Sequence, residues 1–129
     1  MANERLLVID DERGFVDFIS ERLGAKGFHI IRAFNGREGL ERAYADKPDL
    51  IILDIAMPEM NGYDVCRKLK LDKNFKDIPI IMLTAKFQPT DIRFGVGMGA
   101  DSYLTKPLEL ELLLSTVNTL LAKKKTKSA

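Results

Sequence analysis

Several residue types are scarce in this chain, and each shortage argues against a class of function. Cysteine occurs once, at Cys66, so no internal disulfide can form and nothing indicates an oxidising compartment. Neither sign of charge is in excess, because 20 basic residues stand against 19 acidic ones. That balance argues against direct binding to nucleic acid through bulk electrostatics.

Long apolar segments are also missing. No run approaches the roughly 20 apolar residues that a membrane helix needs. Near the N-terminus, Arg5 is followed by only four apolar residues, too few for a signal peptide. We therefore expect a cytoplasmic protein that does not contact a membrane.

What the chain does contain is enough for one globular domain. It has 129 residues, of which 46% are hydrophobic, so a single core can be buried. Short apolar runs without alternation predict strands that are covered on both faces. Three such runs occupy residues 6–9, 50–53 and 78–83. Two weaker strands, which suit the edges of a sheet, are predicted at residues 28–34 and 101–104.

Helical patterns lie between the strands. Apolar residues spaced three and four apart predict helices within residues 15–23, 40–44, 65–69 and 110–121. A further helix is expected within residues 86–99, where Gly95, Gly97 and Gly99 favour a short or mobile one that begins near Pro89.

Strand and helix thus alternate five times. This predicts an α/β fold, a doubly wound, flavodoxin-like parallel sheet with helices on both faces. The strand order 2-1-3-4-5 places the two weaker strands at the edges, so we predict that order. We expect the domain to span residues 1–122 and a short basic tail, residues 123–129, to be frayed.

Polar residues follow four of the five predicted strands. Asp10 and Asp11 follow the first, Asp54 the third, Thr84 the fourth, and Lys106 comes just after the fifth. The carboxyl ends of parallel strands meet at one edge, so these side chains should converge there. Three carboxylates repel one another unless a cation lies among them, and a hard cation such as Mg²⁺ suits oxygen ligands. A carboxylate is also a competent nucleophile in phosphoryl transfer.

These residues lie within four motifs that together resemble a known family. The motifs are Asp10–Asp11, the segment from Asp54 to Gly62, Thr84–Ala85, and the segment from Gly99 to Pro107. The chain is similar to the response-regulator receiver domains of bacterial two-component signalling, over essentially its whole length. The resemblance implies a phosphoryl-accepting signalling switch.

The resemblance also implies a role for each site residue. Asp54 would be phosphorylated, and Lys106 would contact the phosphoryl group. Asp11, Asp54 and the backbone carbonyl of Ala56 would ligate Mg²⁺, with Mn²⁺ as an alternative, while Asp10 would act mainly through metal-bound water.

Other positions would transmit or tune the signal. Thr84 would move toward the phosphoryl group, and Tyr103 would move into the space that Thr84 leaves. A cis bond between Lys106 and Pro107 would fix the direction of the lysine. Lys86 and Ala56 would flank the phosphoryl group and tune its lifetime. A downstream protein would read the face formed by the fourth helix, the fifth strand and the fifth helix.

The partners follow from the same resemblance. The single histidine, His29, lies in a predicted strand away from the strand ends and is an unsuitable phosphoryl donor. The donor must then be a partner histidine kinase, a phosphotransfer protein or a small phosphodonor. The protein would catalyse only its own phosphorylation and dephosphorylation, and would be a monomer or a weak, phosphorylation-dependent dimer.

Other interpretations are less consistent with the residues or remain open. A phosphatase with a strand-end aspartate needs a second acid two residues later, where this chain has Ala56. A flavodoxin-like nucleotide binder needs a phosphate loop after the first strand, where Asp10, Asp11 and Glu12 would repel phosphate. A degenerate receiver that binds proteins constitutively stays open, as does a receiver excised from a larger response regulator or hybrid kinase.

Some site residues could also have purely structural roles. Asp10 and Asp11 could cap the first helix, Tyr103 could serve only in packing, and Cys66 is expected to be inert.

Overall fold

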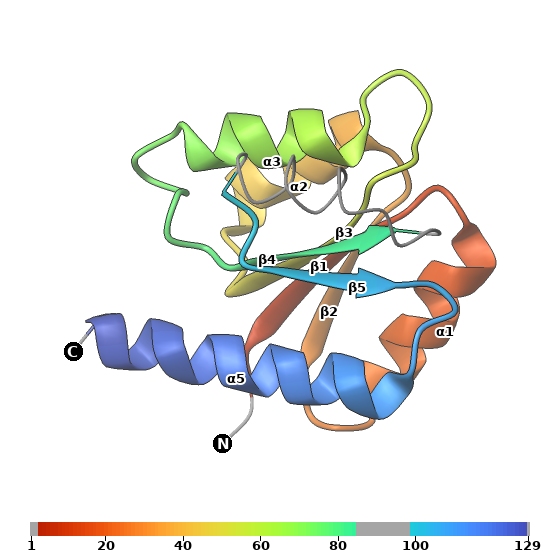
Figure 1. Ribbon diagram of the computed structural model, residues 1–129, viewed down its shortest axis with the longest axis vertical. Helices are drawn as coiled ribbons and strands as arrows, with labels where there is room; N and C mark the ends of the chain where they lie inside the picture. The colour runs from red at the N-terminus through yellow and green to blue at the C-terminus, as the bar shows by residue number, and fades with distance from the viewer. Residues whose placement is uncertain (1–2, 85–98, 129) are drawn as a thin grey trace.

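The computed structural model describes residues 3–84 and 99–128 (Figure 1). Within these residues the strands are β1 (Arg5–Ile9), β2 (His29–Ala33), β3 (Leu50–Asp54), β4 (Ile80–Thr84) and β5 (Ser102–Thr105). The helices are α1 (Arg13–Gly24), α2 (Gly36–Asp46), α3 (Gly62–Lys70) and α5 (Leu110–Ser128).

The strands form one sheet in the order β2-β1-β3-β4-β5, which confirms the predicted fold and strand order. All neighbouring strands run parallel. Every residue of β3 and β4 is buried, whereas β2 and β5 are only partly buried. The weaker apolar patterns therefore do mark the edges, since an edge strand has a neighbour on one side only.

Helices cover both faces of the sheet. Figure 1 shows α2 and α3 on one face and α1 and α5 on the other. Successive residues of each strand point to opposite faces, so the core is divided into two clusters. Toward α2 and α3 point Leu7, Ile9, Ile51, Leu53, Ile80 and Met82. Toward α1 and α5 point Leu6, Val8, Leu50, Ile52, Ile81 and Leu83.

Local sequence signals explain how the helices begin. The Asn35 side chain accepts a hydrogen bond from the backbone N–H of Glu38 at the start of α2. Asn61 does the same for Asp64 at the start of α3, and the Asp64 carboxylate accepts a bond from the Asn61 backbone, which completes a capping box.

The prediction of a frayed tail from residue 123 is wrong for most of that segment. Helix α5 continues through the lysines to Ser128. Lysine is a good helix former, and Lys124 is also held in place, because its Nζ donates to the carbonyl of Asp49 at 3.3 Å. Leu121 remains buried one turn earlier, so the helix still contacts the sheet where the lysines begin.

Part of the prediction lies outside the described residues. The expected helix within residues 86–99 falls almost entirely in the segment 85–98, as does Lys86. In the ranges that the structure does describe, no helix has the length and apolar character needed to cross a bilayer.

Candidate functional site

The predicted site residues converge at the carboxyl edge of the sheet. Four polar or charged side chains are buried among the described residues, and three of them are predicted site residues at the ends of β1, β3 and β4. These are Asp10 at 0% exposure, Asp54 at 4% and Thr84 at 7%. Burying ionisable groups is costly, so their concentration at one edge marks this region as the candidate site.

Three carboxylates lie within one small volume. Asp10, Asp11 and Asp54 each offer an oxygen, and these oxygens lie within 4.8 Å of one another. Asp11 is exposed to solvent, whereas the other two are buried. The opening of the site is therefore lined by Asp11, and the buried pair lies beneath it.

Lys106 is the cation of this cluster. Its Nζ donates to Oδ2 of Asp10 at 2.7 Å and lies 3.4 Å from Oδ1 of Asp54. It also donates to Oε1 of the exposed Glu12 at 3.4 Å. One ammonium thus serves three carboxylates, and the shortest of its contacts is with Asp10.

The backbone around β3 holds Asp54 in place. The Ile55 N–H donates to the carbonyl of Leu83 on β4, and the Gly62 N–H donates back to the carbonyl of Ile55. A Cβ atom at Gly62 would clash with the backbone carbonyl oxygen of Asp54. Position 62 therefore requires glycine, because α3 begins directly against the strand end that carries Asp54.

The electrostatics of the site reflect an excess of buried negative charge. Burial, and then the negative charge of Asp10, raise the pKa of Asp54 from 3.8 to about 6 against the lowering effect of Lys106. Burial also raises the pKa of Asp10. For Lys106, burial lowers the pKa, but the hydrogen bond to Asp10 and the charge of Asp54 outweigh it and raise the pKa overall.

The donor set fits a hard divalent cation. Carboxylate oxygens from Asp10, Asp11 and Asp54 are the ligand type that Mg²⁺ prefers, and the exposed Asp11 leaves room for water ligands. Among the described residues, Lys106 alone does not neutralise the three charges, so a cation would relieve the repulsion from Asp10 and Asp11 that adds to the effect of burial on the pKa of Asp54. These residues therefore fit the predicted metal.

Other predicted positions flank this cluster. Thr84 ends β4, and its carbonyl accepts the backbone N–H of Lys106 at 2.7 Å, which ties the two predicted residues together. The Lys106–Pro107 bond is cis, as the family resemblance implied. Ala56 is exposed just after β3, and the role of its carbonyl as a metal ligand stays a prediction.

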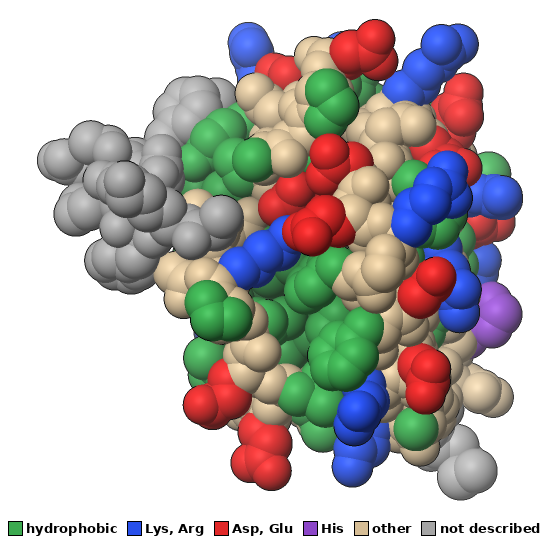
Figure 2. All heavy atoms as spheres, turned by 90° about the vertical axis from the view of Figure 1, so that its right-hand side faces the viewer, with side chains coloured by type: hydrophobic (Ala, Val, Ile, Leu, Met, Phe, Trp, Pro, Cys, Tyr) green, Lys and Arg blue, Asp and Glu red, His purple; other side chains and the backbone are tan. Residues whose placement is uncertain are grey.

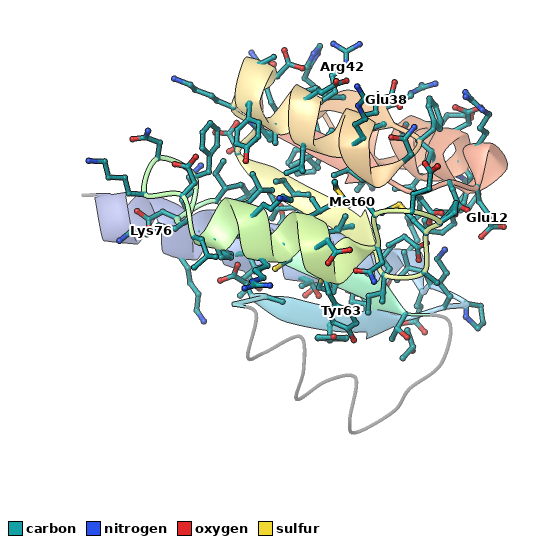
Figure 3. All side chains as sticks on the ribbon, turned by 90° about the horizontal axis from the view of Figure 1, so that it is seen from above. Glu12, Glu38, Arg42, Met60, Tyr63 and Lys76 are labelled. Atoms are coloured by element: carbon teal, nitrogen blue, oxygen red, sulfur yellow. The ribbon has the colours of Figure 1, made fainter. Side chains whose placement is uncertain are left out.

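Tyr103 lies on β5 and faces α3. Its hydroxyl forms a hydrogen bond of 2.9 Å with the hydroxyl of Tyr63, at the start of α3. Figure 3 shows Tyr63 directed from α3 toward β5. The sequence pointed to Tyr103 but not to Tyr63, because no local pattern pairs residues 40 positions apart.

Two residues expected to lie away from the site do so. His29 is exposed at the first residue of β2, which is the amino end of that strand. Cys66 is fully buried on α3, and burial raises the pKa of its thiol to about 11, which keeps it protonated. These observations agree with the predictions that His29 lies away from the strand ends and that Cys66 is inert.

Two further neighbours of the site were missed as well. Phe15, in the first turn of α1, has its ring centroid 4.5 Å from Nζ of Lys106. Glu12, which also reaches Lys106, was weighed only as a charge that repels phosphate.

The chain matches the family model described as "Response regulator receiver domain" over residues 6–118. Among curated proteins, it is 39% identical over 118 residues to Protein PilH of Pseudomonas aeruginosa, covering 92% of this chain and 98% of PilH. It is 42% identical over 105 residues to the alkaline phosphatase synthesis transcriptional regulatory protein PhoP of Bacillus subtilis, covering 81% of this chain. That match covers only 43% of PhoP, so the chain spans less than half of that relative.

A solved structure shares the fold. The chemotaxis protein CheY4 of Vibrio cholerae superposes with a TM-score of 0.87 and 32% sequence identity, covering 92% of this chain and 99% of that one. The sequence, the strand order and the geometry of the strand ends thus lead to the same group of proteins.

Proposed function

This chain belongs to the response-regulator receiver domains, and from that premise we propose that it is a Mg²⁺-dependent switch that accepts a phosphoryl group on Asp54. Receiver domains are phospho-accepting modules of two-component signalling, so the class of function follows from the family. The accepting residue, the metal, the donor and the target are the parts that we propose.

One observation carries the choice of acceptor. Asp54 is a buried carboxylate at the end of β3, with two other carboxylates within 4.8 Å and the Lys106 ammonium at 3.4 Å. Asp10 is fully buried and engaged by Lys106 at 2.7 Å, whereas Asp11 is exposed. Asp54 is thus the buried carboxylate that has the Lys106 ammonium nearby without being its shortest contact.

The chemistry is a displacement at phosphorus. A carboxylate oxygen of Asp54 attacks the phosphorus atom, the bond from phosphorus to the donor atom breaks, and the donor leaves with the electron pair. The product is an acyl phosphate on Asp54. When Mg²⁺ is bound by Asp11, Asp54 and the Ala56 carbonyl, it supplies neutralisation of the charge on the phosphoryl oxygens.

Lys106 neutralises charge from the other side. Its ammonium already lies 3.4 Å from Oδ1 of Asp54, so a short movement away from Asp10 brings it to a phosphoryl oxygen. Lys86 and Pro107 would flank the group. Ala56 offers no acid for the hydrolysis of an external substrate, so the protein acts only on its own phosphoryl group.

The signal would pass through Thr84 and Tyr103. Thr84 is buried at the end of β4, where its hydroxyl can turn toward a phosphoryl oxygen on the adjacent β3. Tyr103 lies on the neighbouring β5, and its inward movement would require release of the hydrogen bond to Tyr63. Phosphorylation would then shift the population between two arrangements of these side chains.

A downstream protein would read the face beside β5 and α5. Leu113 and Val117 point to the sheet, and Leu114 lines the side of α5 that faces α1. Leu112 lies on the remaining flank, with 49% of its surface exposed. A single half-exposed leucine is ordinary on a protein surface, so the proposal of a protein target on this face rests on the family to which the chain belongs.

The remaining parts of the proposal concern the setting. The protein acts in the cytoplasm. The donor is a partner histidine kinase or a phosphotransfer protein, because the single histidine, His29, is exposed at the opposite edge of the sheet. The protein is a monomer, or a weak dimer after phosphorylation.

The decisive experiment measures phosphorylation directly. The protein is incubated with Mg²⁺ and acetyl phosphate, and its intact mass is followed over time. We expect a gain of one phosphoryl group, no gain for Asp54→Asn, and an unchanged gain for the control Asp17→Asn. Asp17 is an exposed aspartate on α1 that pairs with Arg32 and lies outside the acidic cluster.

Each outcome decides a different part of the proposal. A phosphoryl group that persists in Asp54→Asn would refute Asp54 as the acceptor. No gain in the parent protein with acetyl phosphate or with a histidine kinase would favour the degenerate, constitutively binding receiver. Phosphorylation that is unaffected by EDTA would refute the metal dependence.

A further inference from the structure

The surroundings of Lys106 contain a contact that the proposed chemistry does not use. The Phe15 ring centroid lies 4.5 Å from Nζ, within the range of a cation–π interaction. Phe15 comes from the first turn of α1, and Lys106 follows β5, so α1 contributes this ring to a site built by strand ends. The Lys106 side chain is only 16% exposed.

Lys106 has competing partners. The Asp10 carboxylate binds Nζ of Lys106 at 2.7 Å. The Glu12 side chain is 70% exposed, and its carboxylate contacts the same nitrogen from the solvent side at 3.4 Å. For phosphoryl transfer, the ammonium must instead face Asp54. A flexible lysine with three carboxylates within reach needs something that limits its directions.

We propose that Phe15 is a positioning residue, whose ring restrains the Lys106 ammonium next to Asp54 and thereby speeds phosphorylation. The proposal rests on the proposed function of Asp54 and deepens it. The electron-rich face of the ring attracts the ammonium and occupies space that water would otherwise fill. The ring thus keeps the Lys106 ammonium close to Asp54. The N–H groups of the ammonium remain free to change their acceptor from a carboxylate oxygen to a phosphoryl oxygen.

The geometry favours Phe15 over the other aromatic residue nearby on α1. Phe18 is 48% exposed and lies under Arg22, with 5.0 Å between the guanidinium carbon and its ring centroid. Phe15 is half-buried and packs against the cluster beneath α1 and α5, so its ring is fixed in orientation. Figure 2, which looks onto the carboxyl edge, shows a hydrophobic area beside acidic side chains, with a basic side chain between them.

The test compares rates of phosphorylation by acetyl phosphate in saturating Mg²⁺. Phe15→Leu removes the aromatic face, and we expect the rate to fall about 3- to 10-fold. Phe15→Tyr keeps the face and should retain the parent rate. Phe18→Leu is the matched control, since it removes an aromatic ring from the same helix without touching Lys106, and its rate should be unchanged.

Two measurements separate positioning from packing. Replacing Phe15 with 3,4,5-trifluorophenylalanine nearly preserves the shape of the ring but weakens its negative face, so the rate should again fall. In the Lys106→Met background, whose residual rate is followed over hours, Phe15→Leu should have no further effect. Thermal unfolding of each variant shows whether it folds. If Phe15→Leu does not fold, the fluorinated variant tests the proposal in its place.

The results distinguish this inference from the function on which it rests. A parent rate in the trifluorinated variant, or an equal loss for Phe15→Leu with and without the Lys106 ammonium, would overturn the positioning role and leave Asp54 as acceptor. A phosphoryl group found on a residue other than Asp54 would overturn the proposed function itself, and this inference with it.

Discussion

Replacing Asp54 with asparagine should stabilise the folded protein in the absence of divalent cations, although it abolishes the proposed phosphorylation. The buried carboxylate is destabilising because burial, and then the charge of Asp10, raise its pKa from 3.8 to about 6. An asparagine of nearly the same shape has no charge to bury. Lys106 keeps its shorter contact with Asp10 in the variant.

The magnitude follows from linkage between proton binding and folding. A pKa that is higher in the folded than in the unfolded state contributes stability below the unfolded value, and that contribution is lost as the pH rises through the folded value. The pKa of Asp54 rises from 3.8 to about 6 on folding. At about 1.4 kcal/mol per pH unit, the ionised carboxylate therefore lowers the free energy of unfolding by about 3 kcal/mol at pH 8. At pH 4.5, where the carboxyl is mostly protonated in the folded protein, the same relation gives a loss of about 1 kcal/mol in the free energy of unfolding.

Urea unfolding in EDTA at both pH values measures this difference. Asp54→Asn should exceed the parent protein in free energy of unfolding by about 3 kcal/mol at pH 8, and the gap should narrow at pH 4.5. The exposed Asp17→Asn serves as a control that should change stability by less than about 1 kcal/mol. A variant that is less stable than the parent at pH 8, or a gap that does not depend on pH, would refute the reasoning.

Three further predictions concern residues outside the acidic cluster. Ser20 is buried on α1, and its hydroxyl has no hydrogen-bond partner among the described residues, so Ser20→Ala should raise the free energy of unfolding by about 1 kcal/mol. Ser115→Ala, at an exposed position on α5, should raise the free energy of unfolding by less. Equal gains for the two variants would contradict the view that the buried Ser20 hydroxyl is destabilising. Tyr63→Phe should cost about 1 kcal/mol by removing the bond to Tyr103, and the double variant with Tyr103→Phe should lose less stability than the sum of the two single losses; fully additive losses in urea unfolding would argue against this bond. Cys66 should not react with a thiol reagent at pH 8 in the folded protein but should react fully in urea, so fast labelling of the native state would show that it is not buried.

The strand order and the convergence of the acidic residues could be predicted because they depend on local patterns. A strand buried on both faces must be apolar at every position, so the run before Asp54 stands out in the sequence and ends where the strand ends. The apolar pattern of the edge strand that starts at His29 is weaker, because this strand has a neighbour on one side only. The end of α5 was mispredicted, since a run of lysines reads as a solvated terminus, whereas Lys124 also reaches the loop before β3.

The contacts within the site could not be predicted in the same way. The sequence places Lys106 near the carboxylates only through topology, and it does not reveal that Asp10 is its nearest partner. Nor does any local pattern bring Phe15 to that lysine or Tyr63 to Tyr103, because these contacts depend on how helices lie on the sheet and on the rotamers that packing allows.

The sequence by itself determined which residues gather at the functional edge, because parallel strands with right-handed crossovers leave few arrangements and their carboxyl ends coincide. Only the tertiary structure decided the energetics there. It buried Asp10 and Asp54 while leaving Asp11 exposed, and it joined residues 96 positions apart in one ion pair. Burial and pairing are properties of the packed chain, so the charge state and direction of these side chains emerge only when all layers are assembled.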